Sequence, residues 1–194
     1  MKHSIDEQWR VAFLQTVQQH DRALPLREAA LDGRLGAWTK ELTAVVVSTC
    51  QSLGWQASAK GHRLELLPVT GSEYLGIDVM AFADGRTRWR FPVAVIELEN
   101  SQNDDRVAYS LWKVLCLRAD LRIVFCYRRS MAKGSALIRS LKEETIQAMG
   151  LAGRMKLEGE TLVVIGSYDN SSTFPYGFFK WLRLDNNTGT FTQA

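Results

Sequence analysis

The stretch Ala94-Val95-Ile96-Glu97-Leu98-Glu99-Asn100 decides the fold of this chain, because it joins a buried strand to a pair of carboxylates. The apolar run at 93–96 predicts a strand that is buried on both faces, as in the middle of a sheet. Side chains two positions apart on a strand point to the same face, which puts Glu97 and Glu99 roughly 7 Å apart. Their mutual repulsion and loss of hydration raise both pKa values unless a cation joins them.

A further acidic residue lies in the preceding apolar segment, Tyr74-Leu75-Gly76-Ile77-Asp78-Val79-Met80. We expect one strand over 74–83, a turn at Gly85 and the next strand over 91–99, so Asp78 and Glu97 lie on neighbouring strands. Carboxylate oxygens suit a hard divalent cation such as Mg²⁺ or Mn²⁺. The sequence therefore predicts a carboxylate metal site; the alternative is an acidic cluster with a purely structural role.

One α/β domain accounts for the whole chain, residues 1–194. Apolar residues recur at helical spacing in four segments, and the region 21–36 has the character of a connector, with Pro25 and Gly33. The expected helices cover 5–20, 37–53, 105–119 and 134–149. The remaining expected strands cover 62–67, 121–127, 161–167 and 177–184.

The composition is that of a globular protein, with 46% hydrophobic and 23% charged residues. The net charge of +3 neither requires nor opposes a nucleic-acid partner. Asp6, Glu7 and Arg10 in the first turns argue against a signal peptide, and no apolar run approaches the ~20 residues that span a bilayer. We expect a soluble, cytoplasmic protein that does not enter a membrane.

The three cysteines do not suggest a metal site or a disulfide framework. No C-x-x-C pair is present and the three histidines are scattered, which argues against zinc. Cys50 and Cys116 fall on apolar helix stripes and Cys126 falls within an apolar strand. We expect all three to be buried, reduced thiols.

The order helix, strand, strand, strand, helix, strand over about 37–127 resembles the core of the PD-(D/E)XK nuclease superfamily, the restriction-endonuclease-like fold. The resemblance implies a central mixed four-stranded sheet flanked by helices, with an added N-terminal helix and an added C-terminal helix and β-hairpin. Asp78 matches the first acidic position of the family and Glu97 the second. Glu99 stands where the family usually has lysine, although some restriction enzymes of the family have Glu there.

The resemblance also implies a chemistry. Asp78 and Glu97 would hold Mg²⁺ or Mn²⁺, with the Leu98 carbonyl as a further ligand, for the hydrolysis of DNA phosphodiester bonds. Glu99 is then the general base or a second metal ligand, unless another cation replaces the lysine. The family tolerates migration of this lysine to the neighbouring helix, which makes Lys113 a candidate; the alternative is an ordinary solvated lysine.

Two other acidic residues are candidate ligands. Glu41, on the preceding helix, matches an additional carboxylate that some family members carry, against the alternative of an exposed helix residue. Glu73 lies at the start of the strand that contains Asp78 and is a weaker alternative. Asn100 either caps the loop after the third strand or contacts a phosphate.

Basic and aromatic side chains suggest where nucleic acid could bind. Arg106, Ser110 and Lys113 share one flank of the helix expected at 105–119. A basic cluster follows the strand at 121–127, where phosphate contacts are easily made, although a basic loop is also an ordinary solvated loop. Its members are Arg128, Arg129 and Lys133. Tyr109 and Trp112 either stack on bases or pack against another element.

The sequence thus predicts a Mg²⁺-dependent nuclease that acts on DNA. The alternative is a catalytically inactive protein of the same fold that binds nucleic acid or a protein partner, and the missing motif lysine favours it. Restriction enzymes often act as dimers, so a homodimer is an open expectation. A glycosidase is disfavoured, because its two carboxylates must approach the bond from opposite sides, whereas Glu97 and Glu99 lie side by side.

Overall fold

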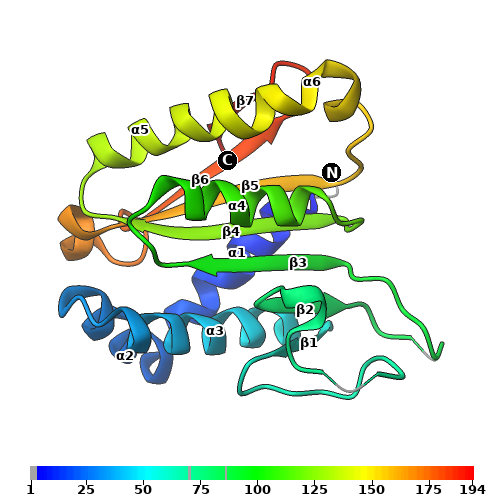
Figure 1. The fold of residues 1–194 in the computed structure, drawn as a ribbon. Helices are drawn as coiled ribbons and strands as arrows, with labels where there is room; N and C mark the ends of the chain where they lie inside the picture. The colour runs from blue at the N-terminus through cyan, green and yellow to red at the C-terminus, as the bar shows by residue number, and fades with distance from the viewer. Residues whose placement is uncertain (1–3, 70, 86) are drawn as a thin grey trace.

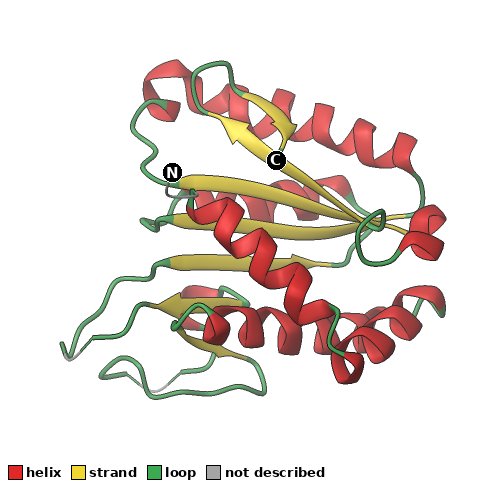
Figure 2. Ribbon diagram, turned by 180° about the vertical axis from the view of Figure 1, so that it is seen from behind, coloured by secondary structure: helices red, strands yellow, loops and turns green. Residues whose placement is uncertain are grey.

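The computed structural model describes residues 4–69, 71–85 and 87–194, apart from the side chains of residues 20 and 22. A seven-stranded mixed sheet lies between two layers of helices (Figures 1 and 2). The helices are α1 (Ile5–Val17), α2 (His20–Leu31), α3 (Leu35–Ser52), α4 (Asp104–Leu115), α5 (Met131–Ser140) and α6 (Gln147–Arg154), with short helical turns η1 (Tyr74–Gly76), η2 (Leu141–Ile146) and η3 (Tyr168–Thr173). The strands are β1 (Gln56–Ala59), β2 (Val79–Phe82), β3 (Ala94–Glu99), β4 (Leu121–Arg128), β5 (Glu160–Ser167), β6 (Phe179–Asp185) and β7 (Thr190–Gln193).

The strands follow one another across the sheet in chain order. β1, β2 and β3 form an antiparallel meander, β3, β4 and β5 run parallel, and β6 and β7 continue antiparallel. Parallel neighbours need a crossover connection, and here α4 joins β3 to β4 while α5, η2 and α6 join β4 to β5. Both crossovers lie on the face of the sheet toward the viewer in Figure 1.

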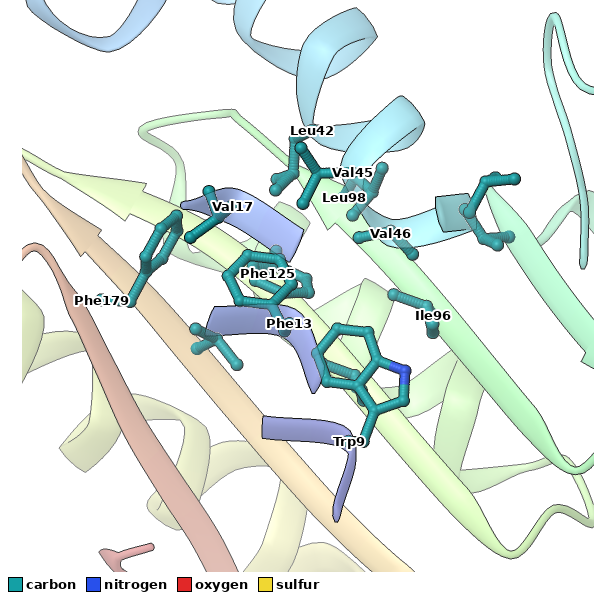
Figure 3. Close-up of a cluster of buried hydrophobic side chains, with 14 of the residues drawn as sticks. Trp9, Phe13, Val17, Leu42, Val45, Val46, Ile96, Leu98, Phe125 and Phe179 are labelled. Atoms are coloured by element: carbon teal, nitrogen blue, oxygen red, sulfur yellow. The ribbon is translucent and has the colours of Figure 1, made fainter. Parts of the chain in front are cut away.

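The opposite face of the sheet packs on α1 and α3 through an aromatic cluster (Figure 3). The rings of Trp9 and Phe13 on α1 stack at 5.3 Å, and Phe13 also lies 5.3 Å from the ring of Phe125 on β4. Phe179 meets Phe13 edge to face at 5.1 Å. Such pairs add about 0.5–1.5 kcal/mol beyond the area that they bury, so this cluster is the firmest part of the core.

The second core lies under α4. Val107, Leu111 and Val114 form the buried stripe of this helix, as their spacing predicts, and pack in one cluster with Val95 and Val124 of the sheet. The helix begins where expected, because the side chain of Asn103 accepts a hydrogen bond from the backbone N–H of Asp105. Because α4 packs on β3 and β4, its residues lie next to the predicted site.

Three predicted elements differ in the structure. The connector at 21–36 is largely helix α2, which tolerates Pro25 because Leu26 and Ala29 bury its inner face in the core. The strand expected at 62–67 is a loop, and the first strand is β1 at 56–59. The strand expected at 74–83 begins with the turn η1, where Leu75 has a φ of 57°, and only residues 79–82 form the strand β2.

The sheet is wider than the expected four strands. β5, β6 and β7 extend the same sheet to seven strands, and β7 falls on a segment that the sequence did not predict as a strand. Cys50 and Cys126 are buried as expected, but the prediction for Cys116 was wrong, because this residue caps the exposed end of α4. Among the described residues, no helix combines the length and apolarity needed to cross a bilayer.

Candidate active site

Asp78 and Glu97 come together at the junction of β2 and β3. Val79 pairs with Ile96 across the two strands, so Asp78, one position before β2, lies beside Glu97. The backbone N–H of Leu98 donates a 2.7 Å hydrogen bond to Oδ2 of Asp78. This bond orients the Asp78 carboxylate and holds the end of η1 against the edge of β3.

Glu97 points toward α4 and is almost completely buried, with 3% of its surface exposed. Its Oε1 lies 2.8 Å from Nζ of Lys113, and its Oε2 accepts a 3.1 Å hydrogen bond from Oγ of Ser110. Ser110 and Lys113 are three residues apart, so they occupy one flank of the helix. α4 therefore supplies both partners of the buried carboxylate.

Lys113 also reaches the turn that precedes Asp78. Its Nζ donates a 2.8 Å hydrogen bond to the carbonyl oxygen of Gly76 in η1. The ammonium group thus joins β3, α4 and η1 at one point, next to both predicted metal ligands. The expectation that Lys113 stands near the acidic pair is correct in its geometry.

Burial dominates the electrostatics of the two carboxyl groups. It raises the pKa of Asp78, and the Leu98 N–H and the charge of Lys113 offset this only in part. Burial likewise raises the pKa of Glu97, opposed by the contact with Lys113 and reinforced by repulsion from Asp78. One ammonium group does not compensate for two partly desolvated carboxylates, so the pair favours a further positive charge.

A cleft of about 1000 Å³ opens beside Asp78. Glu41 from α3 and Glu73 from the loop before η1 line the same cleft, so the structure brings both candidate ligands to the neighbourhood of Asp78. Its other polar and charged walls are Thr39, Lys40, Thr43, Lys60, His62 and Asn100. Glu97 and Lys113 do not line this cleft, and Asp78 forms the boundary between it and the ion pair.

Two predicted residues near the site have structural roles. Oε1 of Glu99 accepts a 2.8 Å hydrogen bond from the backbone N–H of Ser101, which fixes the turn between β3 and α4. The amide of Asn100 donates to Oγ1 of Thr39 at 2.6 Å and so ties the same turn to α3. Glu99 thus supports the loop beside the ion pair.

Asp78 and Glu97 are two neighbouring carboxylates, and both already have partners in the protein. The Leu98 N–H donates to Oδ2 of Asp78, and Lys113 and Ser110 contact the two oxygens of Glu97. In the part of the chain that the structure describes, no group of three or more His, Cys, Asp and Glu side chains could hold a metal ion. Mg²⁺ is commonly bound by only one or two carboxylates and completes its coordination with water and substrate phosphate, so these two side chains are the ones that would hold it.

The basic cluster after β4 is only partly available to a ligand. Arg128 is 2% exposed and donates hydrogen bonds to the carbonyl oxygens of Ser101 and Tyr127 and to Oδ1 of Asp104. The prediction of a phosphate contact for Arg128 was therefore wrong, because its guanidinium group holds the start of α4. Arg106, Arg129 and Lys133 are exposed.

Sequence reasoning placed Ser110 on the helix flank of Lys113 without giving it a role, and it missed three other contributors to the site. Gly76 acts through its backbone carbonyl, which leaves no side-chain signature. Lys40 and Lys60 line the cleft from α3 and from the loop after β1, and only the folded chain brings them together.

Comparisons of the chain with protein-family models, curated proteins and solved structures give no match.

Proposed function

We propose that this protein is a Mg²⁺-dependent nuclease that hydrolyses phosphodiester bonds of DNA, with Asp78, Glu97 and Lys113 as its central residues. The observation that carries the proposal is the 2.8 Å contact between Nζ of Lys113 and Oε1 of Glu97. In this contact the adjacent helix α4 supplies a lysine beside Glu97, the second acidic residue of the proposed PD-(D/E)XK-like site. Glu99 occupies the usual lysine position without supplying a cation.

The topology supports the same proposal. The element order α3, β1, β2, β3, α4, β4 follows the helix–strand–strand–strand–helix–strand order of the PD-(D/E)XK core. The first three of these strands are antiparallel and β3 is parallel to β4, with α4 as the crossover. We infer a restriction-endonuclease-like core, to which β5, β6 and β7 add further strands.

In this proposal Asp78 and Glu97 would hold the magnesium ion. When bound, it would supply a water of lowered pKa and positive charge beside the scissile phosphate. Lys113 contributes a fixed positive charge next to the reacting group, where low dielectric strengthens its effect. Ser110 positions Glu97 through its hydrogen bond to Oε2, and the Leu98 N–H positions Asp78.

The cleft beside Asp78 suits a phosphate backbone. Lys40, Lys60 and His62 on its walls can contact phosphates, which position nucleic acid without reading its sequence. Glu41 is placed to assist as a water-mediated metal ligand from the same cleft. Arg129 and Lys133 follow the carboxyl end of β4 and provide further exposed positive charge.

A second candidate function is binding without catalysis. The carboxylate of Glu99 is engaged by the Ser101 N–H, which favours a structural rather than a catalytic role for the residue at the motif lysine position. A protein of this kind would bind DNA through the same basic walls. It would bind equally well in chelator and in Mg²⁺, and would leave the DNA intact.

The experiment that tests the proposal is cleavage of plasmid and single-stranded DNA in Mg²⁺ and in chelator. Asp78→Asn keeps an oxygen that accepts from the Leu98 N–H, and Glu97→Gln keeps the size of the side chain and one acceptor oxygen. Both remove the negative charge, so each is expected to lower the rate at least about 100-fold. Glu143→Gln, at an exposed position of η2, is the matched control. Wild-type protein that leaves DNA intact in both Mg²⁺ and Mn²⁺ would refute the catalytic proposal.

A further inference from the structure

Five large apolar side chains are exposed to solvent on η1, on the loop before β3 and on α4, and exposed apolar groups of this size are typical of binding surfaces. We define them as the aromatic strip: Leu75 (76% exposed), Trp89 (61%), Phe91 (80%), Tyr109 (54%) and Trp112 (55%). More than half of each side chain is open to a ligand.

Direct contacts connect one end of the strip to the ion pair. The rings of Tyr109 and Trp112 stack at 5.9 Å with an interplanar angle of 18°. Nζ of Lys113 lies 5.7 Å from the centre of the Tyr109 ring, so the same ammonium group touches Glu97 and the edge of the strip. A base stacked on Tyr109 would carry its phosphate toward the proposed metal site.

The other end of the strip lies over an apolar cavity of about 460 Å³. Leu75, Trp89 and Phe91 line this cavity together with Arg90 and Arg118. Leu75 has a φ of 57°, which is strained for a branched side chain, and this conformation accompanies its outward position. The next residue, Gly76, accepts the hydrogen bond from Lys113, so η1 links the cavity to the ion pair.

The charge around the strip identifies the occupant. Residues 88–91 alternate basic and aromatic side chains, Arg88-Trp89-Arg90-Phe91, and Arg118 adds a further positive charge at the cavity. Arg118 lies 4.0 Å from Glu158, but both side chains are about 80% exposed and the pair is weak in water. Aromatic faces alternating with arginine are the surface that binds unpaired bases and the phosphates between them.

We propose that the aromatic strip binds the unpaired bases of single-stranded DNA and delivers the adjoining phosphodiester to Asp78 and Glu97; the second half of this statement rests on the proposed nuclease function. Bases in a duplex are stacked on each other and cannot offer their faces to Tyr109 or Trp89. The strip therefore selects single strands, overhangs and unpaired junctions over blunt duplex.

The test is the fluorescence anisotropy of labelled oligothymidylate and of blunt duplex, titrated with protein in chelator so that no cleavage occurs. The wild type is expected to bind oligothymidylate at least about tenfold more tightly than duplex. Tyr109→Ala, Trp112→Ala and Trp89→Ala are each expected to raise the dissociation constant for the single strand roughly 5- to 100-fold. Tyr176→Ala, at a residue 65% exposed in another loop, is the matched control and is expected to change it less than twofold.

Because the altered side chains are largely exposed, the variants retain the core, which circular dichroism verifies. Equal affinity for duplex and single strand, or strip variants that bind like the wild type, would overturn the proposal. A self-associated wild type that Trp112→Ala dissociates, without binding of oligothymidylate, would do so too and would identify a second copy as the occupant. Loss of cleavage with retained single-strand binding would contradict only the nuclease proposal.

Discussion

Lys113 on α4 and Glu97 on β3 form a buried ion pair, with 2.8 Å between Nζ and Oε1. The side chain of Glu97 is 4% exposed and that of Lys113 22%, so water screens their attraction only weakly. The contact depends on the crossover geometry, in which α4 leaves the end of β3 and packs back over it. A strand residue and a helix residue thereby combine in one site.

If Lys113 replaces the motif lysine, the lysine should function from either position. Adding Glu99→Lys to Lys113→Ala is expected to raise the cleavage rate at least about tenfold above that of Lys113→Ala alone. The reason is that residues 97 and 99 share one face of β3. Cleavage of plasmid DNA by the double variant and by Lys113→Ala alone provides the measurement. Arg129→Lys in the same background is the control. Equal rates for the double and single variants would show that the two positions are not equivalent.

The raised pKa of Glu97 predicts a specific pH dependence of stability. At pH values just above 4.5, the ordinary pKa of a glutamate, Glu97 is still protonated in the folded state but ionised in the unfolded state. The free energy of unfolding therefore falls as the pH rises from 4.5 toward the raised pKa of the folded state. Glu97→Gln lacks this contribution and should therefore gain stability relative to the wild type as pH increases from 4 to 7. Urea unfolding at several pH values measures the difference. A difference that is independent of pH would contradict the assigned environment of Glu97.

Arg128 and its neighbour Arg129 should differ sharply in their effect on stability. Arg128→Ala removes the side-chain donor to the carbonyl oxygen of Ser101, one of the two side-chain donors to that of Tyr127 and the partner of Asp104, and is expected to cost about 2–4 kcal/mol of unfolding free energy. Arg129→Ala, at an exposed position, should stay within about 0.5 kcal/mol of the wild type. Chemical denaturation compares the two. Similar values for both variants would show that the buried contacts of Arg128 do not support the fold.

The three cysteines should differ in reactivity. Burial raises the pKa of Cys50 and Cys126 to about 12, which keeps both as inert thiols, whereas Cys116 is exposed at the end of α4. A thiol reagent is therefore expected to modify one cysteine rapidly in the folded protein and all three after denaturation. Cys116→Ser should remove the rapid reaction. Rapid modification that persists in this variant would place another thiol at the surface.

The acidic pair could be predicted from sequence because its signals are local. Apolar residues around Asp78 and before Glu97 mark two buried strands, and two adjacent antiparallel strands bring such residues together. Lys113 became a candidate through the resemblance, in which the lysine migrates to the neighbouring helix, and helical spacing placed it on one flank beside the stripe of Val107 and Leu111. The acidic pair needed only the periodicity of single elements and the order of their neighbours.

The features that were missed depend on tertiary packing. α2 has little amphipathic pattern of its own and is held by burial of Leu26 and Ala29 in a core built by other elements. Arg128 has the appearance of a solvated loop residue, but its partners come from the turn after β3. The positive φ of Leu75 ends the expected strand early, and no propensity of leucine would suggest it.

The most direct test of the central claim is the rate of single-stranded DNA cleavage in Mg²⁺ by the wild type and by Lys113→Met. Methionine keeps most of the packing of the lysine side chain and removes its charge. Lys156→Met, at an exposed lysine beyond α6, is the control for loss of a positive charge. Our account predicts Mg²⁺-dependent cleavage by the wild type and by the control, and a rate at least about 100-fold lower for Lys113→Met. Cleavage by Lys113→Met at the wild-type rate would contradict the claim that this helix lysine serves the active site.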